Sequence, residues 1–214
     1  NEYQNKKISK AYLLKGLNTI ERYHFINNAI VSGRSSGLDH KYAKYAKELI
    51  SESEKQKKHL VIDQFTNSLL QNLPDKKLFE ANFDNKLYYF SSKTSQKKLV
   101  QYALQKIELK TNPNAMLFGI SIEHIFPEKP KHTDIKLSTE LVGNIGNLVL
   151  LDQGLNSDAK VGNNSFELKK PIITKKTNII TTKEVFNMNS NWGEKEIQER
   201  KTNLIDQLYE NVWK

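Results

Sequence analysis

The segment that decides the fold of this protein runs from Ser121 to Phe166 and reads SIEHIFPEKPKHTDIKLSTELVGNIGNLVLLDQGLNSDAKVGNNSF. Two short apolar runs, 120–126 and 148–151, have the length and the branched side chains typical of β-strands. The second run is followed by DQGLNSDAK, whose turn- and cap-forming residues favour a loop that leads into a short helix. The segment therefore predicts two strands and a short helix.

Polar residues interrupt this pattern where packing alone would place apolar ones. Glu123 and His124 lie inside the first run, Asn147 precedes the second run, and Asn156 follows it. Hydrolysis of a phosphodiester at neutral pH needs a base and a divalent cation. His124 is the candidate base because the ordinary pKa of histidine lies nearest neutrality. Glu123 and Asn156 offer oxygen ligands, which suit Mg²⁺ or Mn²⁺ and argue against zinc or copper.

Asn147 carries both a hydrogen-bond donor and an acceptor. We expect it to brace the long loop after the first strand and to hold the backbone of His124 in place, which is a structural contribution to a catalytic site. A Glu-His pair on a strand also occurs in ordinary half-buried positions, and Asn-rich loops are usually turns. The ordered combination of HIFP, a GNLVLL strand and an Asn-plus-Lys segment is more specific.

Composition limits the class of protein. The 214 residues suffice for one large domain or two small ones, and the absence of Cys excludes disulfides and thiolate metal sites and fits a reducing cytoplasm. No apolar run approaches the ~18 residues of a membrane helix. A net charge of +9, from 33 basic and 24 acidic residues, favours nucleic acid as a partner, with an anionic membrane second. Because the chain begins with Asn1 and not Met, we expect a segment of a longer protein.

The remaining chain predicts a mainly helical protein. Apolar stripes at helical spacing run through residues 1–112, with helices expected to end near Gly33 and Pro74. SESEKQKKH, from Ser51, either continues the second helix or breaks it. We predict an α+β fold, predominantly α-helical with an embedded ββα-metal (HNH) nuclease motif, made of a helical domain (1–112), a nuclease core (113–192) and a C-terminal packing helix (193–214).

Three lysines near the central segment are candidate DNA contacts. Lys160 either binds phosphate or is an ordinary solvated lysine. Lys169 and Lys170 either reach the phosphates flanking the cut or belong to a soluble linker, because the basic stretch that follows is mixed in periodicity and broken by Pro171.

The order of these residues resembles the His-Asn-His superfamily of ββα-metal nucleases, in the variant whose last His is Asn. The whole chain is similar to the C-terminal half of GmrSD-type modification-dependent restriction enzymes and related phosphorothioate-sensing defence proteins. The similarity is carried by RYHFINNAI, LPDKKLFEANF, IEHIFPE, GNLVLLD, LNSDAK, NNSFELKK and NWGEKEIQERKTNLIDQLYENVW. It covers nearly all of the chain, and only the central motif is specific.

The resemblance implies a role for each polar residue. His124 matches the general base, Glu123 the acidic metal ligand, Asn147 the middle Asn and Asn156 the metal-side Asn. Asn163 or Asn164 is the alternative metal-side residue, because the sequence leaves the start of the helix open. Many relatives have Asp in place of Glu; the longer side chain makes a bridging water an alternative to direct ligation.

The resemblance also implies a partner. An N-terminal ParB-like nucleotidase domain with a DGQQR-type motif normally precedes this region; the chain contains no such motif, so nucleotide hydrolysis is not assigned to it. We expect a metal-dependent DNA endonuclease domain of a restriction or phage-defence protein. The alternative is a non-catalytic DNA-binding or assembly module with a degenerate nuclease motif.

Overall fold

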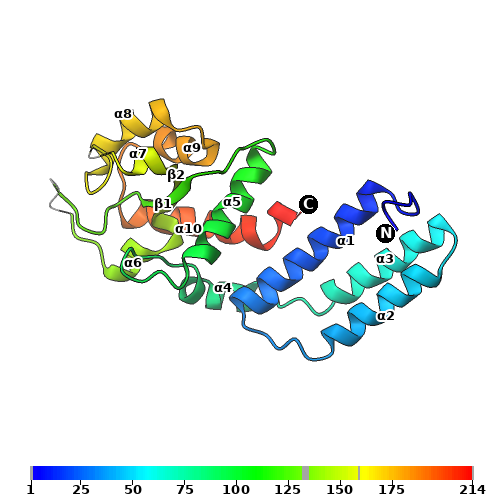
Figure 1. Ribbon diagram of the computed structural model, residues 1–214. Helices are drawn as coiled ribbons and strands as arrows, with labels where there is room; N and C mark the ends of the chain where they lie inside the picture. The colour runs from blue at the N-terminus through cyan, green and yellow to red at the C-terminus, as the bar shows by residue number, and fades with distance from the viewer. Residues whose placement is uncertain (1, 132–134, 159, 214) are drawn as a thin grey trace. The chain divides into compact units, whose positions relative to one another are not determined.

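The computed structural model describes residues 2–131, 135–158 and 160–213, and its chain divides into two units within helix α4 (Figure 1). Unit 1 comprises the chain up to Phe83 together with Trp213, and unit 2 comprises Asp84–Val212. The sequence analysis placed this boundary after residue 112 instead. The difference arises because helix α5 (Lys97–Thr111) packs on strand β2 and helix α9 of unit 2.

Unit 1 is built from helices. Its elements are α1 (Lys10–Tyr23), a π-helical turn η1 (His24–Ile30), α2 (Leu38–Ser51), α3 (Lys55–Leu70) and the first part of α4 (Lys76–Lys86).

The core of unit 1 follows the predicted apolar stripes only in part: Phe25 and Leu69 are buried, whereas Leu14, Leu17 and Leu60 are exposed. Tyr23, Leu38 and Leu69 are buried together, with Tyr42 and Phe65 among the side chains packed around them. Helices α1 and α3, and α2 and α3, lie against each other. Apolar faces at helical spacing on three helices thus account for this unit.

The structure decides how the polar turn after α2 behaves. The helix ends at Ser51, and Glu52 has an extended backbone. The carboxylate of Glu52 accepts hydrogen bonds from the backbone N–H groups of Ser53 and Glu54, at 2.8 and 3.0 Å. These bonds satisfy donors that a continuous helix would have used, so α2 and α3 are separate helices.

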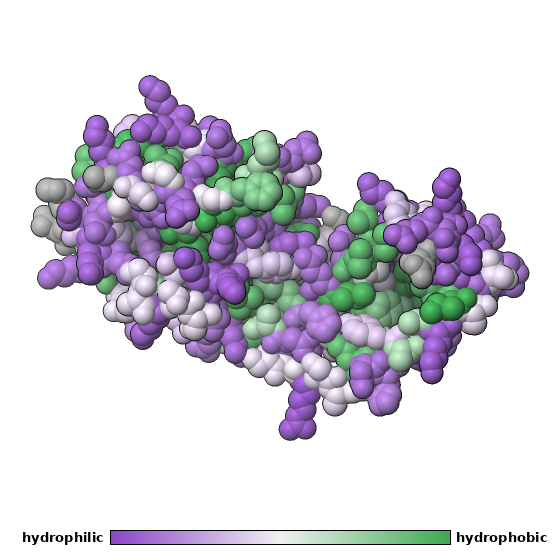
Figure 2. Space-filling view, viewed as in Figure 1, coloured by the Kyte–Doolittle hydropathy of each residue, from purple (hydrophilic) through white to green (hydrophobic). Residues whose placement is uncertain are grey.

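The surface of unit 1 keeps an apolar hollow. Figure 2 shows green, apolar surface over the helices of this unit. A cavity of about 230 Å³ is lined by side chains of α1, α2 and α3: Ile20, Tyr42, Tyr45, Ala46, Leu49, Val61, Ile62 and Phe65. None of the predicted site residues lines it. In the described part of the chain, no helix is long and apolar enough to cross a membrane.

Unit 2 is organised around one antiparallel strand pair. Its elements, beside α5, are β1 (Ile120–His124), α6 (Thr139–Gly143), a 3₁₀ turn η2 (Ile145–Asn147), β2 (Leu148–Asp152), α7 (Gln153–Asn156), α8 (Phe166–Lys176), α9 (Ile180–Met188), α10 (Glu194–Tyr209) and a second 3₁₀ turn η3 (Asn211–Trp213). Ile120 pairs with Asp152 and His124 with Leu148. The protein is thus a mostly helical α+β protein with a small two-stranded sheet, and both predicted strands are confirmed.

The alternative of a linker after the central segment is wrong. Helix α8 runs through Pro171, and α9 follows three residues after α8 ends. Pro171 is exposed, so the carbonyl group that its missing N–H would have bonded can bond water. Phe166 and Ile173 are buried on the other side of α8. Burial of this apolar face stabilises α8 as a helix, although the weak periodicity of its sequence suggested a linker.

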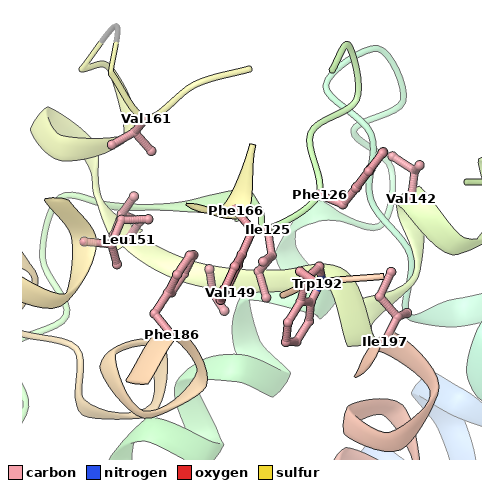
Figure 3. Close-up of a cluster of buried hydrophobic side chains, with 11 residues drawn as sticks. Ile125, Phe126, Val142, Val149, Leu151, Val161, Phe166, Phe186, Trp192 and Ile197 are labelled. Carbon is pink, nitrogen blue, oxygen red and sulfur yellow. The ribbon is translucent and has the colours of Figure 1, made fainter. Parts of the chain in front are cut away.

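Stacked aromatic side chains fix α8 and α9 against the sheet. The ring centroid of Phe166 lies 5.0 Å from that of Phe186 and 5.9 Å from that of Trp192, with the planes nearly parallel. Figure 3 shows these rings beside Val149 and Ile125. This cluster covers one face of the strand pair and holds α8 against it.

The predicted C-terminal helix is confirmed as α10. Ile197, Leu204 and Leu208 are buried on its apolar face. A Cβ atom at Gly146 would lie 2.3 Å from the carbonyl oxygen of Ile197, so only glycine permits this approach of α10 to the turn before β2. Trp213, which belongs to unit 1, follows α10 and lies against Phe25 of the same unit, at 5.5 Å between ring centroids.

Candidate active site

His124, the last residue of β1, is held through one ring nitrogen. Its Nε2 atom lies 2.9 Å from the carbonyl oxygen of Tyr89. A carbonyl oxygen can only accept, so Nε2 carries the proton and Nδ1 carries the lone pair. Burial lowers the pKa of His124, while the Tyr89 carbonyl and the Glu128 carboxylate oppose this shift. The imidazole is therefore neutral at physiological pH, with Nδ1 able to take a proton.

Tyr89 reaches His124 because residues 87–90 run beside the turn after α6. The N–H of Tyr89 donates to the carbonyl of Gly143 at 2.9 Å, and the N–H of Ile145 donates to that of Leu87 at 3.2 Å. The rings of Tyr89 and Phe90 stack near the imidazole, at 5.7 and 6.3 Å between centroids. The sequence analysis missed Tyr89, because a backbone carbonyl leaves no signal in the side-chain pattern.

Glu128 is a second residue that the sequence analysis missed. Its Oε1 atom lies 3.5 Å from Nε2 of His124 and accepts the N–H of Ser91 at 2.6 Å, while Oε2 accepts the hydroxyl of Ser91 at 2.8 Å. The carboxylate therefore stands where it stabilises a positive charge on the imidazole. Its position four residues after His124, in HIFPE, was a signal that could have been used.

Glu123 is buried and paired with Lys169. The Nζ atom of Lys169 lies 2.6 Å from Oε1 of Glu123. Burial raises the pKa of Glu123 and lowers that of Lys169, and the attraction between the two groups opposes both shifts. Lys169 was expected to contact a DNA phosphate; in the structure its side chain is 0% exposed and its ammonium bonds Glu123 inside the protein.

Asn156 lies on the same face of β1 as Glu123. Its Nδ2 atom donates to the hydroxyl of Ser121 at 2.8 Å and to the carbonyl of Ile122 at 3.1 Å. Ser121 and Glu123 are two residues apart on a strand, so their side chains share a face. The last residue of α7 is thereby brought next to the candidate metal ligand.

The donor atoms of this face fit a hard divalent cation. Both described bonds of Asn156 engage Nδ2, so its Oδ1 and the carboxylate of Glu123 are the oxygen donors that this face offers. A Mg²⁺ ion is commonly held by one or two protein oxygens, with waters completing its shell. No group of three His, Cys, Asp or Glu side chains suited to a metal occurs among the described residues. Such a group is not required when one ligand is an amide oxygen.

Asn147 is completely buried and bonded at every polar atom. Its Oδ1 accepts the N–H of Phe126 at 2.8 Å and the indole N–H of Trp192 at 3.0 Å. Its Nδ2 donates to the carbonyls of Phe126 and Val142, both at 2.8 Å. The side chain thus joins the two ends of the long loop between β1 and α6, as the sequence predicted, and its polar atoms are used within the protein. The bond to Trp192 was not foreseen.

The other predicted residues lie in different surroundings. Lys160 is exposed, and its backbone N–H donates to Asp158 at 2.9 Å. The ammonium of Lys170 donates to the carbonyl of Asn189 near the end of α9. Asn163 is exposed, and its described hydrogen bond joins its carbonyl to the N–H of Lys131. The side chain of Asn156, in contrast, contacts β1.

A cavity of about 480 Å³ elsewhere in unit 2 is lined by parts of β2, α5, α9 and α10. Leu104, Ile107, Val185 and Leu204 supply apolar walls, and Arg200 also lines the cavity. None of the predicted site residues lines this cavity, so the volume of a cavity does not locate the candidate chemistry.

Comparison with known proteins supports the assignment of the region. A family model described as "GmrSD restriction endonucleases, C-terminal domain" matches residues 73–207. This range includes both strands and all of the candidate residues. No curated protein matches the chain at a significant level.

Proposed function

Because this chain belongs to the family of GmrSD restriction endonuclease C-terminal domains, we propose that it is a metal-dependent DNA endonuclease of the ββα-metal (HNH) type. In this proposal it hydrolyses phosphodiester bonds as part of a restriction or phage-defence protein. The observation that carries the proposal is the contact of His124 with Tyr89: Nε2–H donates a hydrogen bond to the Tyr89 carbonyl, which places the lone pair on Nδ1.

In the proposed reaction, Nδ1 of His124 accepts a proton from the water that attacks phosphorus. The new P–O bond forms as the bond to the leaving oxygen breaks. The hydrogen bond from Nε2 to Tyr89 keeps the ring oriented, and Glu128 stabilises the imidazolium that forms. This arrangement of base and orienting group is the one that general-base catalysis requires.

Glu123 and Asn156 would hold the divalent cation, Mg²⁺ or Mn²⁺, on the α7 side of β1. When bound, it would neutralise negative charge on the phosphate and the leaving oxygen. The brace made by Asn147 keeps the chain directly after His124 in place, so that the base keeps its position. The family expectation of a preceding ParB-like domain remains part of the proposal.

DNA binding in this proposal is mainly electrostatic. The chain carries a net charge of +9, and Lys160 is exposed four residues after Asn156. Lysines that neutralise phosphates release counterions, which makes binding sensitive to salt. Lys170 is given no DNA contact here because its ammonium bonds Asn189.

A plasmid-cleavage assay tests the function. Supercoiled DNA is incubated with the purified chain in Mg²⁺, in Mn²⁺ and in excess EDTA. We expect nicked or linear product only with metal. Variants Glu123→Ala and Asn156→Ala should lose activity that a higher metal concentration partly restores, because they weaken ion binding and keep the base. Cleavage that persists in EDTA would refute the proposal.

The alternative of a non-catalytic DNA-binding module has one observation in its favour. The buried ion pair with Lys169 occupies Oε1 of Glu123. DNA binding without cleavage in every metal, by a chain shown to be folded, would support this alternative.

A further inference from the structure

Lys169 stands out because a lysine is rarely completely buried. Its ammonium lies 2.6 Å from Oε1 of Glu123, 2.6 Å from the carbonyl oxygen of His124 and 3.2 Å from that of Ile125. An ammonium group has three protons, and all three have acceptors here. The cation is therefore held rigidly at the end of β1, with no exposure to solvent.

This cation cancels the charge of the candidate ligand set. Glu123 and Lys169 together carry a net charge of zero, whichever of the two holds the shared proton, and Asn156 is neutral. Glu128, the other carboxylate near the end of β1, has both oxygens engaged by Ser91. A divalent cation entering beside Glu123 would thus meet an attractive carboxylate and, within a few ångströms, a repelling ammonium. In a buried setting these two Coulomb energies are of similar size.

We propose that Lys169 is the built-in counter-ion of Glu123 and makes tight binding of the divalent cation depend on DNA. This inference rests on the proposed function. In the free protein, the ammonium of Lys169 neutralises the carboxylate of Glu123. A DNA phosphate would then supply the additional negative charge that attracts the divalent cation. Lys169 is then a positioning residue: it orients the carboxylate before the cation arrives and keeps DNA-free affinity for the cation low. Binding of DNA and of metal would reinforce each other, as linked equilibria require.

A purely structural lysine would have the opposite effect when it is removed. If Lys169 served only to orient Glu123, its loss would leave the carboxylate disordered and would weaken metal binding. If it acts as a counter-ion, its loss frees the carboxylate and strengthens metal binding in the absence of DNA. The sign of the change in affinity therefore separates the two roles.

The experiment measures Mn²⁺ binding by the EPR signal of the free ion. All proteins carry His124→Ala so that DNA stays intact, and a short DNA duplex alone is titrated to subtract its own Mn²⁺ binding. We expect Mn²⁺ to bind about tenfold more tightly with the duplex than without it, a coupling within the range usual for linked sites. Adding Lys169→Met should strengthen DNA-free binding about tenfold and remove most of the coupling.

The neighbouring lysine provides the matched control. Lys170→Met removes an ammonium from the same helix that bonds Asn189 and does not contact Glu123. It should leave both Mn²⁺ affinities unchanged. DNA-free affinity that stays equal or falls in a folded Lys169→Met protein would overturn the inference. If that variant does not fold, equal Mn²⁺ affinity with and without DNA in the protein that retains Lys169 would overturn it.

Plasmid cleavage by the unsubstituted chain is scored separately. Absent cleavage counts against the proposed function. Mn²⁺ binding that ignores both DNA and Lys169, in a chain that cleaves DNA with Mg²⁺, counts against this inference alone.

Discussion

Each unit of the protein contains a completely buried lysine, and the two differ in what surrounds them. In unit 1, Lys58 lies 2.8 Å from a carboxylate oxygen of Glu2 and also donates to the carbonyl of Leu49. In unit 2, Lys169 lies 2.6 Å from Glu123 and donates to the carbonyls of His124, the last residue of β1, and of Ile125. A buried lysine-glutamate pair is therefore not by itself a sign of a functional site.

A histidine lies close to each of these ion pairs, and the two histidines differ in how the lone pair of the imidazole is used. In unit 1, Nε2 of His59 accepts the N–H of Ser9 at 3.3 Å, so the lone pair on the imidazole is already used. In unit 2, Nε2 of His124 donates to Tyr89, so the lone pair is on the other nitrogen. A neutral imidazole has one acceptor nitrogen, and its direction of hydrogen bonding decides whether it can act as a base.

The first prediction concerns the rate of DNA cleavage after substitution of each of these two histidines. His124→Ala should lower the rate of plasmid cleavage by about 10²–10⁴, because the general base is lost. His59→Ala is the control and should leave the rate unchanged. Both variants are checked for an unchanged circular dichroism spectrum and for DNA binding. Wild-type cleavage by His124→Ala, in protein free of contaminating nucleases, would refute the assignment of the base.

The second prediction compares two buried asparagines. Asn147→Ala should lower the free energy of unfolding by about 3 kcal/mol, because buried N–H groups of Phe126 and Trp192 lose their acceptor. Asn27→Ala in unit 1 should cost less, since within the described residues Nδ2 of Asn27 has no partner. Urea denaturation measures both. An Asn147→Ala protein of unchanged stability and strongly reduced Mn²⁺ affinity would place Asn147 among the metal ligands.

The third prediction uses the pKa of His124. Burial lowers this pKa from its ordinary value, and only the neutral imidazole can accept a proton. Cleavage should therefore rise with pH through a pKa below about 6.5 and fall about tenfold for each pH unit below that pKa. Glu128→Gln removes a carboxylate that raises the pKa, so it should move the acid limb to lower pH. Single-turnover cleavage by both proteins across this pH range measures the acid limb of each rate profile. An acid limb at higher pH in Glu128→Gln would contradict the prediction.

The smallest expected effect concerns where DNA binds. Lys160→Ala should weaken DNA binding a few-fold and reduce the slope of log affinity against log salt by about 1. Lys55→Ala, which removes an exposed lysine of unit 1, should change the slope less. Fluorescence anisotropy at several salt concentrations measures both slopes. Equal losses would show that phosphate contacts are spread over both units.

The local elements around the candidate site could be predicted from the amino-acid pattern. The lengths of two apolar runs located β1 and β2, because short branched runs bounded by turn residues favour strands. The chemistry of Asn147 predicted a brace across the long loop, since one buried amide can join two stretches of backbone. The apolar stripes of unit 1 and of α10 were visible because helical packing repeats with a fixed period.

The contacts between side chains far apart in the sequence became visible only in the folded protein. Lys169 lies 46 positions after Glu123, and Tyr89 lies 35 positions before His124. The first pairing buries a lysine that the sequence analysis expected at the DNA, and the second orients the ring of His124. The boundary between the units and the course of α8 through Pro171 were likewise settled by packing. Periodicity describes how one element is buried; contacts between distant elements depend on how their faces fit together, which no local pattern records.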